Sequence, residues 1–183
     1  MNSRNKILLL AASFLMLMSG GFAADNDNGK SDLSATATES YQIRNKKFGD
    51  LLRPENANAA EGTRIVLYPA ESWKCMTWKL RPAGVSGFQI QNHFTSKTFT
   101  VNTNHSGTNV VQTAFAREAS ERPVWHFTKL PDGSYEITDV KSGAALTAIG
   151  EDSQSVRVVV APWQDKAEQK WELAKTDPAK LTM

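Results

Sequence analysis

Four aromatic side chains and one arginine are the residues of this chain whose types and spacing could bind a ligand. Trp73 lies five residues after Tyr68, and Phe115 and Trp163 stand in comparable stretches further along the chain. All four rings lie in or beside the loops that connect predicted strands. Such loops run over the surface, where large rings have no core to fill. Such rings can stack on the apolar face of a ligand, and the guanidinium of Arg53 can grip an acidic group through two hydrogen bonds.

Polar side chains of the neighbouring long loops are the predicted partners of these rings. They are Asn56, Asn58, Asn102, Asn104, Asp152 and Gln154. Together with the rings they would line shallow binding sites. The alternative is that the rings only close one end of the fold.

The histidines and the cysteine offer no catalytic or metal-binding pattern. His93, His105 and His126 lie far apart in the sequence and lack the spacing of metal ligands, and neither a G-x-S-x-G nor an H-E-x-x-H motif occurs. The single Cys75 excludes an internal disulfide. We therefore predict a protein that is not an enzyme and that needs no metal or cofactor.

A threefold repeat must position these residues. Trp78, Trp125 and Trp171 lie 47 and 46 residues apart. Each follows, by 37, 37 and 36 residues, an aromatic that opens a run alternating between apolar and polar positions: Tyr41, Phe88 and Tyr135. A fixed period of this size indicates units that bury their apolar faces against one another.

Each unit contains the same four short strand signals. The alternating run comes first, and a second apolar position follows its isoleucine by nine residues, at Leu52, Phe99 and Leu146. A loop rich in Asn, Gly, Asp and Ser precedes a β-branched run, and the tryptophan strand closes the unit. Short strands with regular turn signals predict an all-β fold of about twelve strands.

These motifs carry a resemblance to a known family. The third unit has Lys141-Ser142-Gly143-Ala144-Ala145-Leu146 and Gln169-Lys170-Trp171, and the second has Gly107-Thr108-Asn109-Val110-Val111-Gln112. In this the chain resembles the ricin B-type lectins, whose units end in Gln-x-Trp. The resemblance implies a β-trefoil of three repeats, 41–87, 88–134 and 135–174, in which Trp78, Trp125 and Trp171 are structural core residues.

The resemblance also implies degenerate galactose sites. In this family an aspartate after the second strand and a ring at the end of the third strand hold the sugar. The aspartate position falls on Arg53, Thr100 and Thr147, and the ring position on Tyr68, Thr113 and Ala161. No unit keeps both groups. A cation at Arg53 beside Tyr68 would favour an acidic sugar such as a sialic or uronic acid.

The N-terminus has the pattern of a secretory signal peptide. Residues 1–23 combine a basic start, a short apolar run and small residues before a cleavage point after Ala23, and residues 24–40 form a polar segment expected to be flexible. Residues 175–183 are expected to be a weakly held tail. We expect an exported protein, secreted or periplasmic in a Gram-negative bacterium, with no membrane span once mature.

The net charge of the mature protein argues against nucleic acid as its partner. Cleavage would remove two of the 21 basic residues and none of the 19 acidic ones, so the mature protein would be formally neutral. A neutral protein has no general electrostatic attraction to nucleic acid. Two hypotheses follow for the binding function: a carbohydrate-binding module whose partner is a glycan or glycoconjugate, or a β-trefoil that binds a protein, as an inhibitor or as the cell-binding subunit of a toxin.

Overall fold

The computed structural model describes residue 33 and residues 37–85, 87–102, 108–151 and 156–182. The expected signal peptide and most of the leader lie outside the described residues. So do His105 and three of the predicted polar partners, Asn104, Asp152 and Gln154. Within the described ranges no helix is long and apolar enough to cross a membrane.

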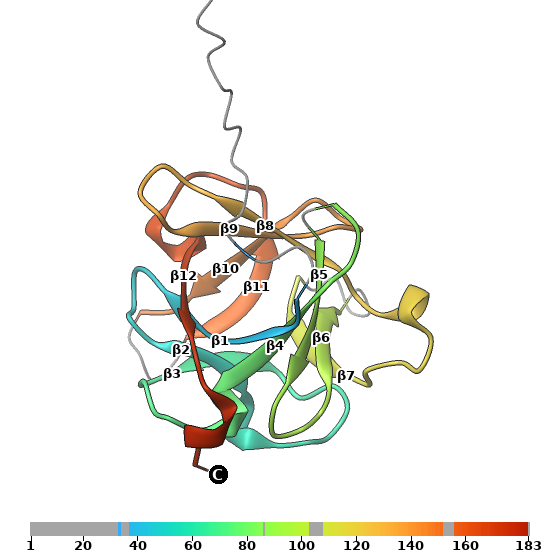
Figure 1. Ribbon diagram of the computed structural model, residues 1–183. Coiled ribbons are helices and arrows are strands. Elements are labelled where there is room, and N and C mark those ends of the chain that lie inside the picture. Colours follow the sequence, from blue (N-terminus) through green and yellow to red (C-terminus); the bar gives the residue numbers. More distant parts are fainter. Residues whose placement is uncertain (1–32, 34–36, 86, 103–107, 152–155, 183) are drawn as a thin grey trace, which may run out of the picture.

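Six strands close into a barrel (Figure 1). They are the first and fourth strands of the three repeats: β1 (Glu39–Asn45), β4 (Thr77–Pro82), β5 (Gly87–Asn92), β8 (Trp125–Lys129), β9 (Tyr135–Asp139) and β12 (Lys170–Lys175). Each strand pairs antiparallel with the next in this order, and β12 pairs with β1. Because the ring closes on itself, these strands leave no free edge.

The remaining strands form one hairpin in each repeat. The hairpins are β2 (Leu51–Pro54) with β3 (Ile65–Tyr68), β6 (Thr98–Val101) with β7 (Val110–Thr113), and β10 (Ala145–Ile149) with β11 (Arg157–Ala161). A closed six-stranded barrel with three hairpins is a β-trefoil. The predicted all-β class and the twelve strands are confirmed.

Short 3-10 turns are the helical segments of the described chain. They are η1 (Glu55–Ala57), η2 (Lys74–Met76), η3 (Ala119–Glu121), η4 (Ala167–Gln169) and η5 (Pro178–Lys180). Three of them, η2, η3 and η4, lie in the connections between the third and fourth strands of the three units. These connections also carry the candidate rings Trp73, Phe115 and Trp163.

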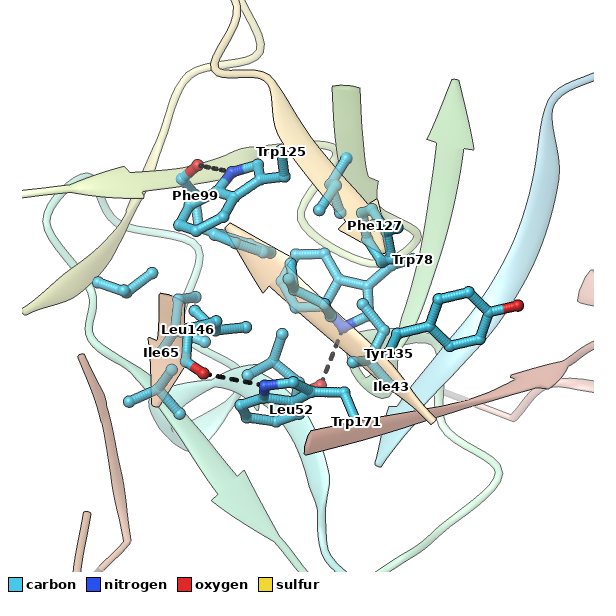
Figure 2. Close-up of a cluster of buried hydrophobic side chains, with 14 of the residues drawn as sticks. Ile43, Leu52, Ile65, Trp78, Phe99, Trp125, Phe127, Tyr135, Leu146 and Trp171 are labelled. Carbon is cyan, nitrogen blue, oxygen red and sulfur yellow. Dashed lines mark hydrogen bonds between the residues drawn. The ribbon is translucent and has the colours of Figure 1, made fainter. Parts of the chain in front are cut away.

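The three repeat tryptophans form the centre of the core (Figure 2). Each is fully buried, and each indole Nε1 donates to the carbonyl of its own unit's second-strand residue. Trp78 bonds Leu52 at 2.9 Å, Trp125 bonds Phe99 at 3.4 Å and Trp171 bonds Leu146 at 3.0 Å. The Phe99 ring lies between two of the indoles, with centroids 5.1 Å from Trp78 and 5.0 Å from Trp125.

Two strand boundaries differ from the expected repeat limits. β1 begins at Glu39, inside the expected leader, because Glu39 and Ser40 pair with residues of β4. β12 continues to Lys175, which pairs with Tyr41 of β1. Leu33, the large apolar residue of the expected leader, is 7% exposed and belongs to the core cluster.

Candidate functional site

Tyr68 and Trp73 come together beside the first hairpin. Tyr68 is the last residue of β3 and is 37% exposed, and Pro69 follows it at the end of the strand. Trp73 lies in the next connection, where its carbonyl accepts from the Met76 amide at 3.0 Å and the Thr77 hydroxyl at 3.2 Å. The two ring centroids are 5.9 Å apart, with a 31° angle between the ring planes.

Arg53 completes this cluster from β2. Its Cζ lies 3.7 Å from the centre of the Tyr68 ring and 6.0 Å from that of Trp73. The predicted association of Arg53, Tyr68 and Trp73 is therefore present in the structure. Cys75 is buried next to them, and burial raises the pKa of its thiol, while the Arg53 charge acts in the opposite direction.

Arg53 is a buried charge that forms no ion pair with the described part of the chain. The residue is 8% exposed, and its Nε has no hydrogen-bond partner. None of the ion pairs formed among the described residues includes it. Burial of a guanidinium without an ion-pair partner is unfavourable for folding, and contact of its charge with the two rings offsets part of this cost.

Two pockets adjoin at this cluster. The first, here called the aromatic pocket, has a volume of about 620 Å³ and is lined by Arg53, Asn56, Ala57, Tyr68, Trp73, Cys75, Phe94 and Thr182. The second, the arginine pocket, has about 450 Å³ and is lined by Arg53, Glu55, Asn56, Arg64, Val66, Leu67, Tyr68, Pro69, Val156 and Arg157. They share Arg53, Asn56 and Tyr68, so these three residues lie between the two pockets.

Backbone strain occurs at the same place. Asn56 and Ala57 follow β2 with φ values of 53° and 52°, in the left-handed region. Asparagine tolerates this conformation, but alanine adopts it at a cost. Non-glycine residues in such conformations cluster at binding and active sites, which agrees with the position of both residues on the pocket wall.

The other two candidate rings do not join this cluster. Phe115 lies in the β7–β8 connection and packs against two guanidinium groups, with the Cζ of Arg122 at 4.2 Å and that of Arg81 at 5.7 Å from its centroid. Trp163 lies half-buried in the β11–β12 connection. Neither ring lines the aromatic or the arginine pocket.

Of the predicted polar partners that the structure describes, one lies at this cluster and the others lie away from it. Asn56 lines both pockets. Asn58 accepts from the Ala60 amide through its side chain and from Gln112 through its carbonyl, and Asn102 pairs by its backbone with Asn109. Asn56 is thus the described member of the predicted set that reaches the cluster.

The third unit has a smaller pocket of about 310 Å³ at the aspartate and ring positions that the resemblance implied for this unit, Thr147 and Ala161. Thr147, Ala161 and Gln169 are among its lining residues. The amide of Gln169 donates to the Thr147 hydroxyl at 3.1 Å and to the Pro162 carbonyl at 2.8 Å, and its oxygen accepts from the Gln164 amide at 2.7 Å. These polar groups are therefore engaged within the fold.

Several pocket residues were not predicted from the sequence. Arg64 and Arg157 face one pocket, while Phe94 and Thr182 reach the other from the second unit and the C-terminal tail. No sequence signal marks them, because they depend on pairings between distant segments. Among the described residues no group of three or more His, Cys, Asp or Glu side chains is placed to hold a metal ion.

Comparisons with known proteins agree with this architecture. The sequence pattern of the family described as "Ricin-type beta-trefoil lectin domain" matches residues 39–171. No curated protein sequence matches the chain.

Three solved structures illustrate the similarity of fold. The Rhizoctonia solani agglutinin is 18% identical with a TM-score of 0.65, and the match covers 80% of this chain and 100% of that one. The Macrolepiota procera ricin B-like lectin in complex with lactose is 15% identical with a TM-score of 0.63 and the same coverage. The exo-β-1,3-galactanase 1,3Gal43A from Clostridium thermocellum is 18% identical with a TM-score of 0.68, over 76% of this chain but only 31% of the enzyme. Identities this low establish the fold alone.

Proposed function

The chain belongs to the family of ricin-type β-trefoil lectin domains, and on that premise we propose that it is a carbohydrate-binding module whose principal site is the aromatic pocket. The observation that carries the proposal is the pair of rings, Tyr68 and Trp73, which lie 5.9 Å apart beside a pocket of about 620 Å³. The apolar face of a sugar ring packs on aromatic rings, while a few polar groups fix its orientation. Asn56 and Thr182 provide such groups in the pocket lining.

The proposed site differs from the usual galactose site of the family. In place of an aspartate, the matching positions carry Arg53, Thr100 and Thr147. A guanidinium only donates hydrogen bonds, and a threonine hydroxyl has a single donor and no charge. We therefore propose that galactose and lactose are not bound by the family's usual geometry, even though the lactose complex of the Macrolepiota lectin has a similar fold.

Binding to a glycan array, followed by calorimetry with the best ligand, tests the proposal. Tyr68→Ala and Trp73→Ala should each weaken binding at least about tenfold, because aromatic anchors dominate binding sites of this kind. Val140→Ala is the matched control, since it removes an apolar side chain that is 47% exposed and lies outside both pockets.

Other outcomes would contradict the proposed site or the proposed function. Loss of binding in Trp163→Ala alone would move the site to the third unit. Absence of any glycan ligand, with a protein that co-purifies at a fixed stoichiometry, would favour the alternative of a protein-binding β-trefoil.

We also propose that the protein acts outside the cytoplasm, as the signal-peptide pattern of residues 1–23 suggests. The mature protein would then begin at Ala24 and be secreted or periplasmic. Intact-mass measurement of the protein recovered from cell fractions tests this. A chain that keeps residues 1–23 and stays in the cytoplasm would contradict it.

A further inference from the structure

We propose that the arginine pocket binds an anionic substituent of the glycan, so that the preferred ligand is an acidic sugar. This inference rests on the proposed function, because it assigns the ligand's charged group to the pocket that adjoins the ring-stacking site. The charged group can be a carboxylate or a sulfate ester, since both present oxygens that a guanidinium binds through parallel hydrogen bonds.

The first argument is the unpaired charge of Arg53. The residue is 8% exposed, its Nε is buried without a hydrogen-bond partner, and the ion pairs of the described chain do not include it. A buried charge of this kind lowers stability unless it is paired. An anionic ligand would supply the missing partner.

The second argument is the charge of the pocket wall. Among the described residues, three arginines, Arg53, Arg64 and Arg157, line the arginine pocket with one carboxylate, that of Glu55. Glu55 is already bound by Arg64, with nitrogen–oxygen distances of 2.8 Å and 3.2 Å. The described lining of the pocket therefore keeps an excess of positive charge after the ion pair between Arg64 and Glu55 has formed.

The third argument is the arrangement of Arg53 on Tyr68. The Cζ lies 3.7 Å from the ring centre, so the ring occupies one side of the guanidinium group. Its N–H groups lie in the guanidinium plane and do not need that side for hydrogen bonding. Tyr68 and Arg53 both line the two pockets. A sugar packed on the rings could therefore place an acidic substituent against the arginines.

Calorimetry with matched neutral and acidic sugars tests the inference. The probes are galactose, galacturonic acid and galactose 6-sulfate, and lactose with 6'-sialyllactose. The acidic member should bind about tenfold or more tightly than its neutral partner, the change expected from one charge-assisted hydrogen bond. The difference should shrink as salt is added. Comparing galacturonic acid with galactose 6-sulfate then distinguishes carboxylate from sulfate.

Two arginine variants distinguish binding in the arginine pocket from a general effect of the protein's positive charge. Arg53→Met should remove the preference for acidic sugars without lowering the melting temperature, because it keeps an apolar stem and removes an unpaired buried charge. Arg117→Ala is the matched control: it removes one positive charge from an exposed residue outside both pockets and should leave the preference intact.

The failure of this inference is distinguishable from failure of the proposed function. Equal affinities for neutral and acidic sugars, or an acidic preference that survives Arg53→Met, would overturn the inference while sensitivity to Tyr68→Ala still supported a glycan site. A sugar affinity that is unchanged by both Tyr68→Ala and Trp73→Ala would overturn the proposed site. If none of the three acidic sugars bound, the anionic assignment would be rejected.

Discussion

The indole of each repeat tryptophan joins two ends of its own unit. It reaches from the fourth strand to a carbonyl of the second strand, across 25 or 26 residues of chain. Each bond satisfies a polar N–H that would otherwise be buried alone, while the ring fills the core. One side chain thus supplies both packing and register, which explains why the tryptophans recur with the period of the repeat.

Replacing a core tryptophan should cost far more stability than replacing a loop tryptophan. Trp171→Ala empties a fully buried position and should lower the free energy of unfolding by about 3–5 kcal/mol. Trp163→Ala, in a connection, is the matched control and should cost about 1 kcal/mol or less. Urea unfolding of the two variants checks this. Equal losses would mean that Trp163 is also a core residue.

His93 should make stability depend on pH. Burial lowers the pKa of its imidazole below 6.5, the charges of Lys79 and Lys74 act in the same direction, and a ring nitrogen contacts the Ser40 hydroxyl at 2.8 Å. Below about pH 6.5 the unfolded chain takes up a proton that the native state resists, so this contribution is fully present above that pH and lost as the pH falls.

Denaturation midpoints measured between about pH 7 and about pH 5.5 check the role of His93. His93→Gln should flatten the loss of stability over this interval, because glutamine keeps a polar partner for Ser40 and cannot titrate. His126→Gln is the control, since His126 is exposed on β8. An unchanged pH profile in His93→Gln would contradict the assignment.

The C-terminal tail takes part in the first unit, at the lower end of the view in Figure 1. The amide of Lys74 donates to the carbonyl of Thr182 at 3.0 Å, and the amide of Thr182 donates to the carbonyl of Ser72 at 2.9 Å. Asp177 caps the turn η5 by accepting from the Ala179 amide at 3.0 Å. The tail therefore braces the connection that carries Trp73, which its polar composition did not indicate.

Truncation after Thr176 tests this brace. The amide of Lys74 should lose its protection against hydrogen exchange, because its acceptor is removed. Sugar affinity should fall, because Trp73 loosens and the aromatic pocket loses Thr182. The melting temperature should change little, since residues 177–182 contribute no side chain to the described core. The Asn92 amide, bonded to Lys97 at 2.8 Å in the second unit, is the internal control. Unchanged Lys74 exchange would contradict the role of the tail.

The sequence repeat made the strands predictable, whereas the contacts between units could not be predicted from it. Period and alternation indicated the strands, and the spacing of the tryptophans indicated the core. The arginine pocket instead depends on β11 meeting β3, where Arg157 lies opposite Val66 across 91 positions of chain. The packing of Phe115 against Arg81 and Arg122 is likewise tertiary. Local sequence patterns carry no information about contacts between distant segments. They therefore predicted the candidate rings but not the residues that surround them.

The three units share one barrel but differ in chemistry. At the end of the third strand the first unit has Tyr68, where the second has Thr113 and the third has Ala161. The repeat conserves the positions that close the core and allows the loops to diverge. This division allows the first unit alone to carry the proposed site, because loop changes leave the buried tryptophans undisturbed.

No part of the barrel should fold without the rest. β1 pairs with β4 of its own unit and with β12 of the third unit, and β8 pairs with β9 across the boundary of the second. A fragment ending at Leu130 loses β9 and β12. The pairings of β1 with β12 and of β8 with β9 are then lost, and the edges of β1 and β8 are exposed. It also loses Trp171, Leu146 and Ile137 from the common core. The intact protein should therefore melt in one transition, while the fragment should show no cooperative melting by circular dichroism or calorimetry. A soluble fragment that melts cooperatively would mean that two units suffice for a core, and that the barrel need not close for this chain to fold.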